Sequence, residues 1–316
     1  FQVDAAALPT LTEFEVGDRI TITLNASGKV VSACSSSEKN VVMVGLLADD
    51  KGTVELLNGI TVSGTFSNTV TNLVGKLVKI SATGKGRFSA TGLAGGVNAD
   101  LDVSAGLLGT RSLAEDVIIY ECVGKSSMVA ISLEDILTAT VDAEDILYAG
   151  TNSKGLVNLL LLDDVTGDAY TYGRLTTGTD STTVEYTDAS GNKVTLTNRT
   201  VSVTNGDGSS GTYITGDSSL TSGAFGGIAW SDVTGKTTGT ASLTAVKNIS
   251  RSAFDGDASV TVDGTVIPLA DNVQVYNTSS GKWVTLAQAK AFADTFTIYY
   301  DRTLTTGAKV RVIATQ

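Results

Sequence analysis

Side chains that could do chemistry are few in this chain, and histidine is absent altogether. Without histidine the sequence lacks the commonest general base, the Ser-His-Asp arrangement and the usual ligand of transition metals. A cysteine nucleophile would lack its histidine partner for the same reason. The Gly-x-Ser-x-Gly pattern of a serine nucleophile does not occur either.

Neighbouring carboxylates are the remaining catalytic candidates. They occur as Glu134-Asp135, Glu144-Asp145 and Asp163-Asp164. Two carboxylates can hydrolyse a glycosidic bond when both face that bond. Adjacent residues of a strand point to opposite faces, so solvated surface acids are the simpler interpretation. The sequence therefore predicts a protein that is not an enzyme and has no certain cofactor, with a carboxylate hydrolase as a remaining hypothesis.

Calcium is the ligand that the loop composition favours. Ca²⁺ binds several carboxylate and carbonyl oxygens at once. Loops rich in such oxygens contain Asp164, Asp168, Asp207, Asp255 and Asp257, which are the candidate ligands. None of these loops matches the twelve-residue EF-hand pattern, and Asp-Gly pairs also form ordinary turns.

Two cysteines and two tryptophans are the other distinctive side chains. Cys34 and Cys122 fit either a disulfide in a secreted protein or two separate buried thiols. They cannot complete a zinc site, because the chain has no histidine. Trp230 and Trp283 could serve as platforms for carbohydrate, but their strand-like apolar surroundings favour packing in a core.

The elements that must position these residues repeat along the chain. The segment LAEDVIIY at residues 113–120 returns as LADNVQVY at residues 269–276, a spacing of 269 − 113 = 156 residues. A repeat of this length has the size of a domain, whereas a solenoid repeat spans about 20–50 residues. The spacing predicts two tandem related modules, residues 1–142 and 143–316.

A shorter motif, a helical turn followed by two strands, occurs three times, at residues 11–31, 133–157 and 286–312. Alternating apolar residues predict strands at 19–24 and 295–300, and residues 25–28 predict a hairpin turn. Residues 286–293 predict a helix with Thr285 as its N-cap. Because three motifs accompany two modules, we expect the first motif either to close its own module or to pair with a sheet edge of another subunit.

The composition predicts the fold class. Val, Ile and Thr dominate the periodic stretches, and such β-branched residues pack well on pleated surfaces. We therefore predict a mainly β fold of two tandem related β-barrel or β-sandwich modules with short helical segments. Residues 73–80 and 223–230 occupy comparable places in the two modules.

The second module is longer, and its surplus lies in a Ser/Thr/Gly-rich insertion at about residues 180–223. This insertion predicts a hairpin with strands at 183–186 and 194–197, followed by an exposed loop at 204–219.

Charge and hydropathy exclude several partners. The formal net charge is −11, which would repel the phosphate backbone of nucleic acids. No apolar run approaches 18 residues, so the sequence predicts no membrane span. A chain that begins at Phe1 without Met is typical of a processed secreted protein or of an excised fragment.

Several segments resemble the β-rich region of secreted Firmicutes proteins that carry S-layer homology domains. They are LLDDVTGDAYTYG at residues 161–173, residues 271–276 with 296–301 and 309–313, and the Gly17-Asp18 strand and turn with residues 28–30. The resemblance covers most of the chain. The S-layer homology domain itself, a helical wall-binding repeat, does not occur in this sequence. The resemblance implies an extracellular, surface-displayed or array-forming module without catalytic residues.

These observations together predict an extracellular structural protein of the bacterial cell surface, a self-assembling subunit of a surface layer or filament. Its expected partners are copies of itself and other cell-envelope proteins. A surface adhesin or glycan-binding module, with residues 180–223 as the recognition surface, is the alternative.

Overall fold

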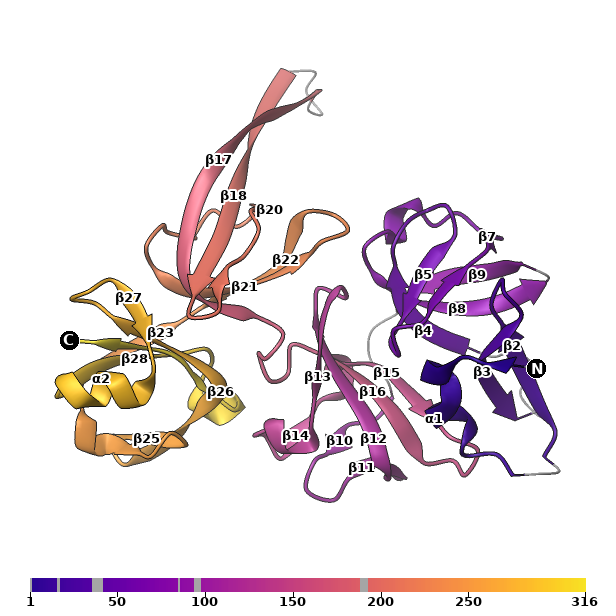
Figure 1. Ribbon diagram of the computed structural model, residues 1–316, viewed down its shortest axis with the longest axis horizontal. Helices are drawn as coiled ribbons and strands as arrows, with labels where there is room; N and C mark the ends of the chain where they lie inside the picture. The colour runs from indigo at the N-terminus through magenta and orange to yellow at the C-terminus, as the bar shows by residue number, and fades with distance from the viewer. Residues whose placement is uncertain (1, 16–17, 36–41, 85, 94–97, 188–192) are drawn as a thin grey trace. The chain divides into compact units, whose positions relative to one another are not determined.

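The computed structural model describes residues 2–15, 18–35, 42–84, 86–93, 98–187 and 193–316 (Figure 1). The chain is mainly β, with two related modules and short helical segments, which confirms the predicted fold class. Its contacts divide it into two compact units. The first holds residues 1–133, 139–165 and 231–234, and the second holds residues 134–138, 166–230 and 235–316.

The first unit begins with a three-stranded sheet in the order β1-β3-β2, in which β1 is parallel to β3. Its elements are β1 (Gln2–Val3), η1 (Ala5–Ala7), α1 (Leu8–Leu11), β2 (Ile20–Leu24) and β3 (Lys29–Ser35). The side-chain oxygen of Asn25 accepts hydrogen bonds from the backbone N–H groups of Ser27 and Lys29. Gly28 adopts φ 79° in the same turn, so the predicted hairpin is confirmed.

A small barrel, barrel 1, follows. Its elements are β4 (Val42–Leu47), β5 (Thr53–Leu56), β6 (Thr61–Ser63), β7 (Thr65–Phe66), η2 (Thr71–Leu73), β8 (Leu77–Gly84) and β9 (Arg87–Gly92). The strand order is β6-β5-β4-β8-β9-β7, and only Gly64 separates β6 from β7, so this bent strand closes the barrel. A Cβ atom on Gly64 would lie 2.8 Å from the carbonyl oxygen of Gly86, and the bend therefore needs glycine.

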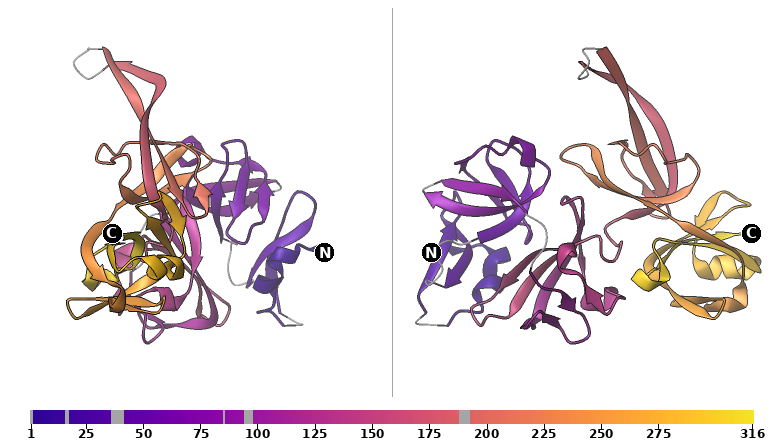
Figure 2. Two further views of the ribbon diagram at one scale, coloured as in Figure 1. Left: turned by 60° about the vertical axis from the view of Figure 1, so that its left-hand side comes forward. Right: turned by 180° about the vertical axis from the view of Figure 1, so that it is seen from behind.

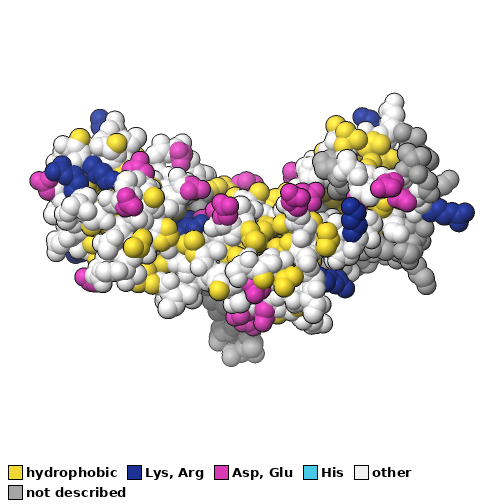
Figure 3. All heavy atoms as spheres, turned by 90° about the horizontal axis from the view of Figure 1, so that it is seen from below, with side chains coloured by type: hydrophobic (Ala, Val, Ile, Leu, Met, Phe, Trp, Pro, Cys, Tyr) yellow, Lys and Arg dark blue, Asp and Glu magenta, His cyan; other side chains and the backbone are white. Residues whose placement is uncertain are grey.

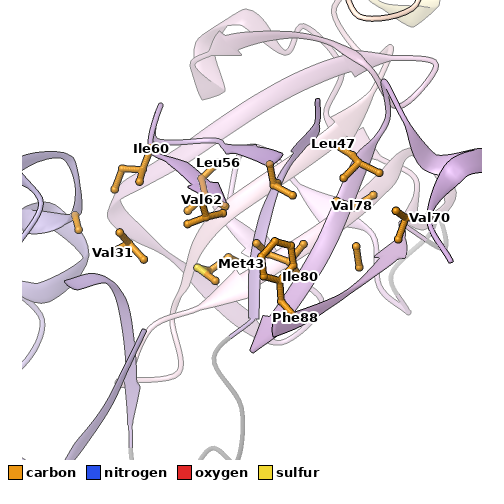
Figure 4. Packing of buried hydrophobic residues seen from close by; sticks show 13 residues of the cluster. Val31, Met43, Leu47, Leu56, Ile60, Val62, Val70, Val78, Ile80 and Phe88 are labelled. Carbon is orange, nitrogen blue, oxygen red and sulfur yellow. The ribbon is translucent and has the colours of Figure 1, made fainter. Parts of the chain in front are cut away.

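The core of barrel 1 is apolar and includes side chains from the N-terminal sheet. Figure 4 shows Val31 of β3 near Ile60, Leu56 and Val62. Ala7 of η1 belongs to the same cluster and is fully buried. In this chain the first hairpin motif therefore packs on its own barrel, as one of the two expected arrangements requires.

The next sheet, sheet 1, has the order β14-β10-β11-β12-β16-β15, with β13 as a hairpin partner of β12. Its elements are β10 (Leu101–Asp102), β11 (Leu107–Leu108), β12 (Arg111–Val123), β13 (Ser127–Ile131), η3 (Leu133–Asp135), β14 (Thr140–Val141), η4 (Ala143–Asp145), β15 (Ile146–Thr151) and β16 (Val157–Asp163). Because β16 pairs in parallel with β12, residues up to 165 belong to the first unit, beyond the expected module limit at residue 142.

The second unit contains a second barrel, barrel 2, with the same topology as barrel 1. Its elements are β17 (Thr171–Thr187), β18 (Lys193–Asn205), β19 (Gly208–Ser209), β20 (Tyr213–Thr215), β21 (Phe225–Ser231) and β22 (Lys236–Ser242). The strands β17-β21-β22-β20-β18 form a ring that is closed by pairing of β17 with β18, and β20 is parallel to β22 as β7 is to β9.

Backbone hydrogen bonds show which residues of the two barrels are equivalent. The N–H of Gly75 donates to the carbonyl of Leu47, and the N–H of Gly223 donates to that of Leu175. Both glycines have positive φ, at 77° and 86°. Gly75 is therefore equivalent to Gly223, so residues 73–80 match residues 221–228, two residues away from the predicted match with 223–230.

The last sheet, sheet 2, repeats the strand order of sheet 1 as β28-β29-β26-β25-β24, and β23 pairs with β28 at its edge. Its elements are β23 (Thr244–Ser250), η5 (Arg251–Ala253), β24 (Phe254–Asp255), β25 (Ser259–Val262), β26 (Thr265–Asn277), β27 (Lys282–Val284), α2 (Leu286–Phe292), β28 (Thr295–Tyr300), η6 (Leu304–Thr306) and β29 (Val310–Thr315). The predicted helix is confirmed as α2, and Thr285 and Gln288 form a capping box at its start.

The repeated octapeptide lies at the same structural position in both sheets. The parallel register of sheet 1 shifts between Leu113 and Ile118, and that of sheet 2 shifts between Leu269 and Gln274. These residues are 156 positions apart in each case, since 269 − 113 = 156 and 274 − 118 = 156. The duplication seen in the sequence is thus a duplication of sheet topology, including its irregularity.

The insertion in the second module departs in part from prediction. Register pairs such as Val184 with Leu196 confirm the predicted hairpin strands, whereas its turn at 188–192 lies outside the described residues. The expected exposed loop at 204–219 is wrong over part of its length, because β20 lies there and its Tyr213 is buried. The barrel needs this short strand to bridge β18 and β22.

We expect that substitution of Phe296 by alanine lowers the free energy of unfolding by about 3–5 kcal/mol, measured by chemical denaturation. Phe296 is fully buried and its ring lies 5.3 Å from that of Phe254, so the shorter side chain leaves a cavity. The control Val266→Ala removes a side chain that is 63% exposed and should change stability by less than about 0.5 kcal/mol. Equal effects of the two substitutions would contradict this assignment of the core.

Candidate functional site

The five candidate calcium ligands lie in three different places. Asp164 and Asp168 are in the loop between β16 and β17, Asp207 lies between β18 and β19, and Asp255 and Asp257 lie at the end of β24 and in the β24–β25 turn. Among the described residues, no group of three or more His, Cys, Asp or Glu could hold a metal ion. The structure does not bring the five together, and calcium binding stays a prediction.

Other groups engage several of these aspartates. Asp207 accepts a hydrogen bond from the side-chain amide of Gln274, at 3.3 Å. Asp257 lies 3.8 Å from the ammonium group of Lys290. Burial, followed by the charge of Asp164, raises the pKa of the Asp163 carboxyl.

The two cysteines are not joined by a disulfide in this structure. Cys122 is buried in an apolar cluster with Leu77 and Leu161, whereas Cys34 packs at the edge of the barrel 1 core. Burial, together with the nearby Asp163 charge, raises the pKa of the Cys122 thiol to about 12. Cys122 therefore stays protonated at neutral pH and is a weak nucleophile and a weak metal ligand.

The most highly charged part of the interior is the Arg311 cluster, which we define as Arg311, Lys309, Asp168 and Asp301. The guanidinium of Arg311 is fully buried and donates to both carboxylates, with its Nε 2.6 Å from Asp301 Oδ2. Lys309 Nζ lies 2.8 Å from Asp168 Oδ2. The two cations and two anions balance, which is the condition under which buried charges are tolerated.

The cluster fixes the loop that leads into barrel 2 onto sheet 2. Arg311 also donates to the carbonyl of Thr166, and its guanidinium lies 4.9 Å from the centre of the Tyr172 ring. Gly167 has φ 77°, and a Cβ atom there would lie 2.7 Å from Asp301 Oδ2. Only glycine fits between the loop and the buried carboxylate of Asp301. The next residue, Asp168, pairs with Arg311 and Lys309 and is therefore a structural ion-pair partner in this chain.

Burial would raise the pKa of Asp168, but the Arg311 charge and hydrogen bonds from Lys309 and Arg311 outweigh burial and lower it. Burial would likewise lower the pKa of Arg311, and its interactions with Tyr172, Asp301 and Asp168 raise it instead. Each charged form is therefore stabilised by the others.

A second feature is the ribbon, defined as the paired residues 179–187 and 193–199 of β17 and β18. In barrel 2, β17 pairs with β21 only at residues 171–174 and β18 pairs with β20 only at residues 199–201. Beyond these positions the two strands pair with each other as far as Thr187 and Lys193. Figures 1 and 2 show the ribbon extending past the rest of barrel 2.

A third feature is a pocket of about 340 Å³ where barrel 2 meets sheet 2, which we call the junction pocket. It is lined by Arg174, Leu175, Thr176, Thr204, Ser222, Gly223, Tyr276, Gly281 and Trp283. Arg174 donates from Nη1 to the hydroxyl of Tyr276 at 3.0 Å and from Nε to the carbonyl of Gly223 at 3.3 Å.

The two tryptophans have different surroundings. Trp230 stacks on Tyr213 with ring centres 4.9 Å apart and packs against the core of barrel 2, as expected from the sequence. Trp283 is only half-buried and lines the junction pocket, where its ring lies 4.9 Å from that of Tyr276. Sequence reasoning missed Arg174 in this pocket. A comparison of Arg174 with its barrel 1 equivalent, Leu46, would have drawn attention to it.

Searches of family models, curated proteins and solved structures find no match to this chain. No described helix is long and apolar enough to cross a membrane.

We expect that substitution of Arg311 by methionine lowers the free energy of unfolding by about 3–5 kcal/mol at neutral pH, because Asp168 and Asp301 then lose their buried cation. Chemical denaturation of both proteins measures the difference. Substitution of the exposed Arg111 by methionine is the control and should have little effect. A value for Arg311→Met equal to that of the control would show that the cluster does not stabilise the fold.

The same cluster predicts a loss of stability in acid. Because the folded-state pKa of Asp168 is lowered, its contribution is complete above the unfolded pKa of about 3.9 and is lost as the pH falls through the lower folded value. Denaturation between about pH 2 and 5 should therefore show a steeper decline for the natural chain than for Arg311→Met. Parallel curves for the two proteins would contradict this assignment.

Proposed function

We propose that the chain is a structural subunit of a bacterial surface layer or extracellular filament, and that it acts by self-association. The observation that carries the proposal is the ribbon. A two-stranded ribbon on its own is only marginally stable in water, so a ribbon of this length is suited to a partner that covers it.

The register pairs Val184 with Leu196 and Tyr186 with Val194, and the alternate positions pair Glu185 with Thr195 and Thr187 with Lys193. In the sequence, apolar and polar residue types therefore alternate along both strands of the ribbon. The backbone edges of the ribbon are also templates for strand addition.

Among its described residues, the first module has no counterpart of the ribbon. The equivalent strands of barrel 1, β4 and β5, have six and four residues, whereas β17 and β18 have 17 and 13. The strands of barrel 2 are therefore longer than barrel closure requires. An additional role in contacts with another subunit accounts for their length.

The composition supports a structural role over a catalytic one. The chain has no histidine, and charged residues make up only 17% of it. On the face shown in Figure 3, Asp and Glu side chains lie among uncharged and hydrophobic ones and do not form one continuous acidic surface. Such a surface can pack against copies of itself once salt screens the net negative charge. The resemblance to S-layer-type secreted proteins supports the same surface location.

We expect that replacing residues 181–197 by Asn-Gly abolishes self-assembly while the modules stay folded, because Thr179 pairs with Arg199 and the turn then joins Asp180 to Asn198. Asn-Gly forms a tight hairpin turn, so barrel 2 keeps its closing strand pair. Electron microscopy and sedimentation of both proteins, with and without calcium and at two salt concentrations, measure assembly. Circular dichroism checks the fold.

Asp263→Asn is the control for this experiment, because it changes another hairpin turn, next to Gly264 at φ 81°, where Asn is equally suited. It should assemble as the natural chain does. Sheets or fibres formed by the ribbon-deleted protein would refute the role of the ribbon, and a natural chain that remains dispersed in every condition would refute self-assembly.

A further inference from the structure

We propose that the junction pocket of the second module binds a carboxylate-bearing sugar residue of a glycan. This inference goes beyond self-association and does not rest on it. It gives the glycan-binding alternative suggested by the sequence a specific place and a specific ligand chemistry.

The duplicated architecture supplies an internal comparison. Arg174 pairs with Phe225 in barrel 2, and the equivalent register in barrel 1 pairs Leu46 with Leu77. Leu46 and Leu77 both belong to an apolar cluster that fills the junction between barrel 1 and sheet 1. The same position thus carries an apolar side chain in one module and a cation in the other.

The junction of the second module also lacks an apolar side chain that the first junction has. Leu57 packs against the apolar cluster of the first junction, and its carbonyl accepts a hydrogen bond from Tyr120. Gly206 is the equivalent residue of barrel 2. Arg174 pairs with Thr204 as Leu46 pairs with Glu55, so Gly206, two residues after Thr204, corresponds to Leu57, two residues after Glu55. A Cβ atom on Gly206 would lie 3.1 Å from Oε1 of Gln274 and 3.8 Å from Cβ of Trp283, so Gly206 contributes no apolar side chain to this junction where Leu57 contributes one to the first.

Arg174 supplies a positive charge that its neighbours hold in place but do not neutralise. Its two hydrogen-bond acceptors, the Tyr276 hydroxyl and the Gly223 carbonyl, are both uncharged groups. Over the described part of the chain, no Asp or Glu forms a salt bridge with Arg174. An exposed guanidinium with fixed orientation is the preferred partner of a carboxylate.

The rest of the lining suits a sugar ring. Trp283 and Tyr276 present aromatic surface to the pocket, and the apolar face of a pyranose ring packs on such surface. Thr176, Thr204 and Ser222 bring hydroxyl groups that can donate and accept hydrogen bonds. A volume of about 340 Å³ lies at the lower end of the range for small-molecule pockets, which matches one sugar residue.

The combination selects an acidic sugar over other anions. A polyphosphate would require several cations, and Arg174 is the single charged residue of the lining. A simple carboxylate would leave the aromatic surface and the hydroxyl groups unused. An acidic sugar uses the cation, the rings and the hydroxyls together.

The test uses Trp283 as its own reporter. The chain has two tryptophans, so Trp230→Phe leaves Trp283 as the single source of tryptophan fluorescence. This protein is titrated with methyl glucuronide, methyl glucoside and acetate, and calorimetry on the unsubstituted chain repeats the titrations in case Trp230→Phe disturbs the fold. We expect saturable binding of the glucuronide and binding of the other two ligands that is weaker by about tenfold or more.

Arg174→Leu installs the residue type found at the equivalent position of barrel 1, and we expect it to weaken glucuronide binding by about tenfold or more. Arg174→Lys keeps the charge without the planar geometry and should have an intermediate affinity. Lys282→Ala is the matched control, because it removes the exposed cation next to Trp283 that does not line the pocket.

The proposal is overturned by an absence of saturable binding, by equal affinity for glucuronide and glucoside, or by unchanged affinity in a folded Arg174→Leu protein. Because the signal comes from Trp283 itself, the outcome does not depend on whether the chain assembles. A failure of self-assembly and a failure of sugar binding are therefore distinguishable.

Discussion

This architecture depends on one constraint, which is parallel strand pairing. The long strand of each sheet pairs in parallel with the last strand of that sheet along the chain, β12 with β16 and β26 with β29. Neighbouring parallel strands need a long connection. Here it carries β13, η3, β14, η4 and β15 in sheet 1, and β27, α2, β28 and η6 in sheet 2. Strands paired in this way are covered on both faces. Leu160, Leu161 and Leu162 of β16 are fully buried, as are Val310, Val312 and Ile313 of β29. The other elements of each sheet are arranged around this buried pair.

The two modules share this frame but differ in how their polar groups are satisfied. The turn before the last strand is closed by a side-chain oxygen in each of the three hairpin motifs, from Asn25, Asn152 and Asp301. The first two residues are neutral, whereas Asp301 is charged and buried and has Arg311 as its partner. A buried charge at this turn therefore requires an opposite charge on the neighbouring strand. The Arg311 cluster is the result of having Asp301 where the other two motifs have asparagine.

The junctions between barrel and sheet also differ, and again the second module is the more polar one. In the first module, apolar side chains fill the space between barrel and sheet, and Tyr120 satisfies its hydroxyl with a backbone carbonyl. In the second module, Tyr276 accepts a hydrogen bond from Arg174, and the space beside it stays open. One copy thus keeps a closed hydrophobic contact, and the other exchanges part of that contact for a polar cavity.

Much of the fold could be predicted from the sequence, because alternation, turn residues and capping residues act locally. The hairpin turn at Asn25–Gly28 and the capped helix after Thr285 are of this kind. The short strand β20 was missed because barrel closure, not local propensity, requires it. The role of Asp168 was missed for a similar reason, since its partner Arg311 is 143 residues away in the sequence.

One connection within the second unit has a mechanical consequence. Only Leu243 separates β22 of barrel 2 from β23 of sheet 2, and β23 is held along its length by antiparallel pairing with β28. Tension along β22 would pass directly into β23 and load its hydrogen bonds to β28 side by side. Such bonds must rupture together and not one after another, so this connection would resist stretching.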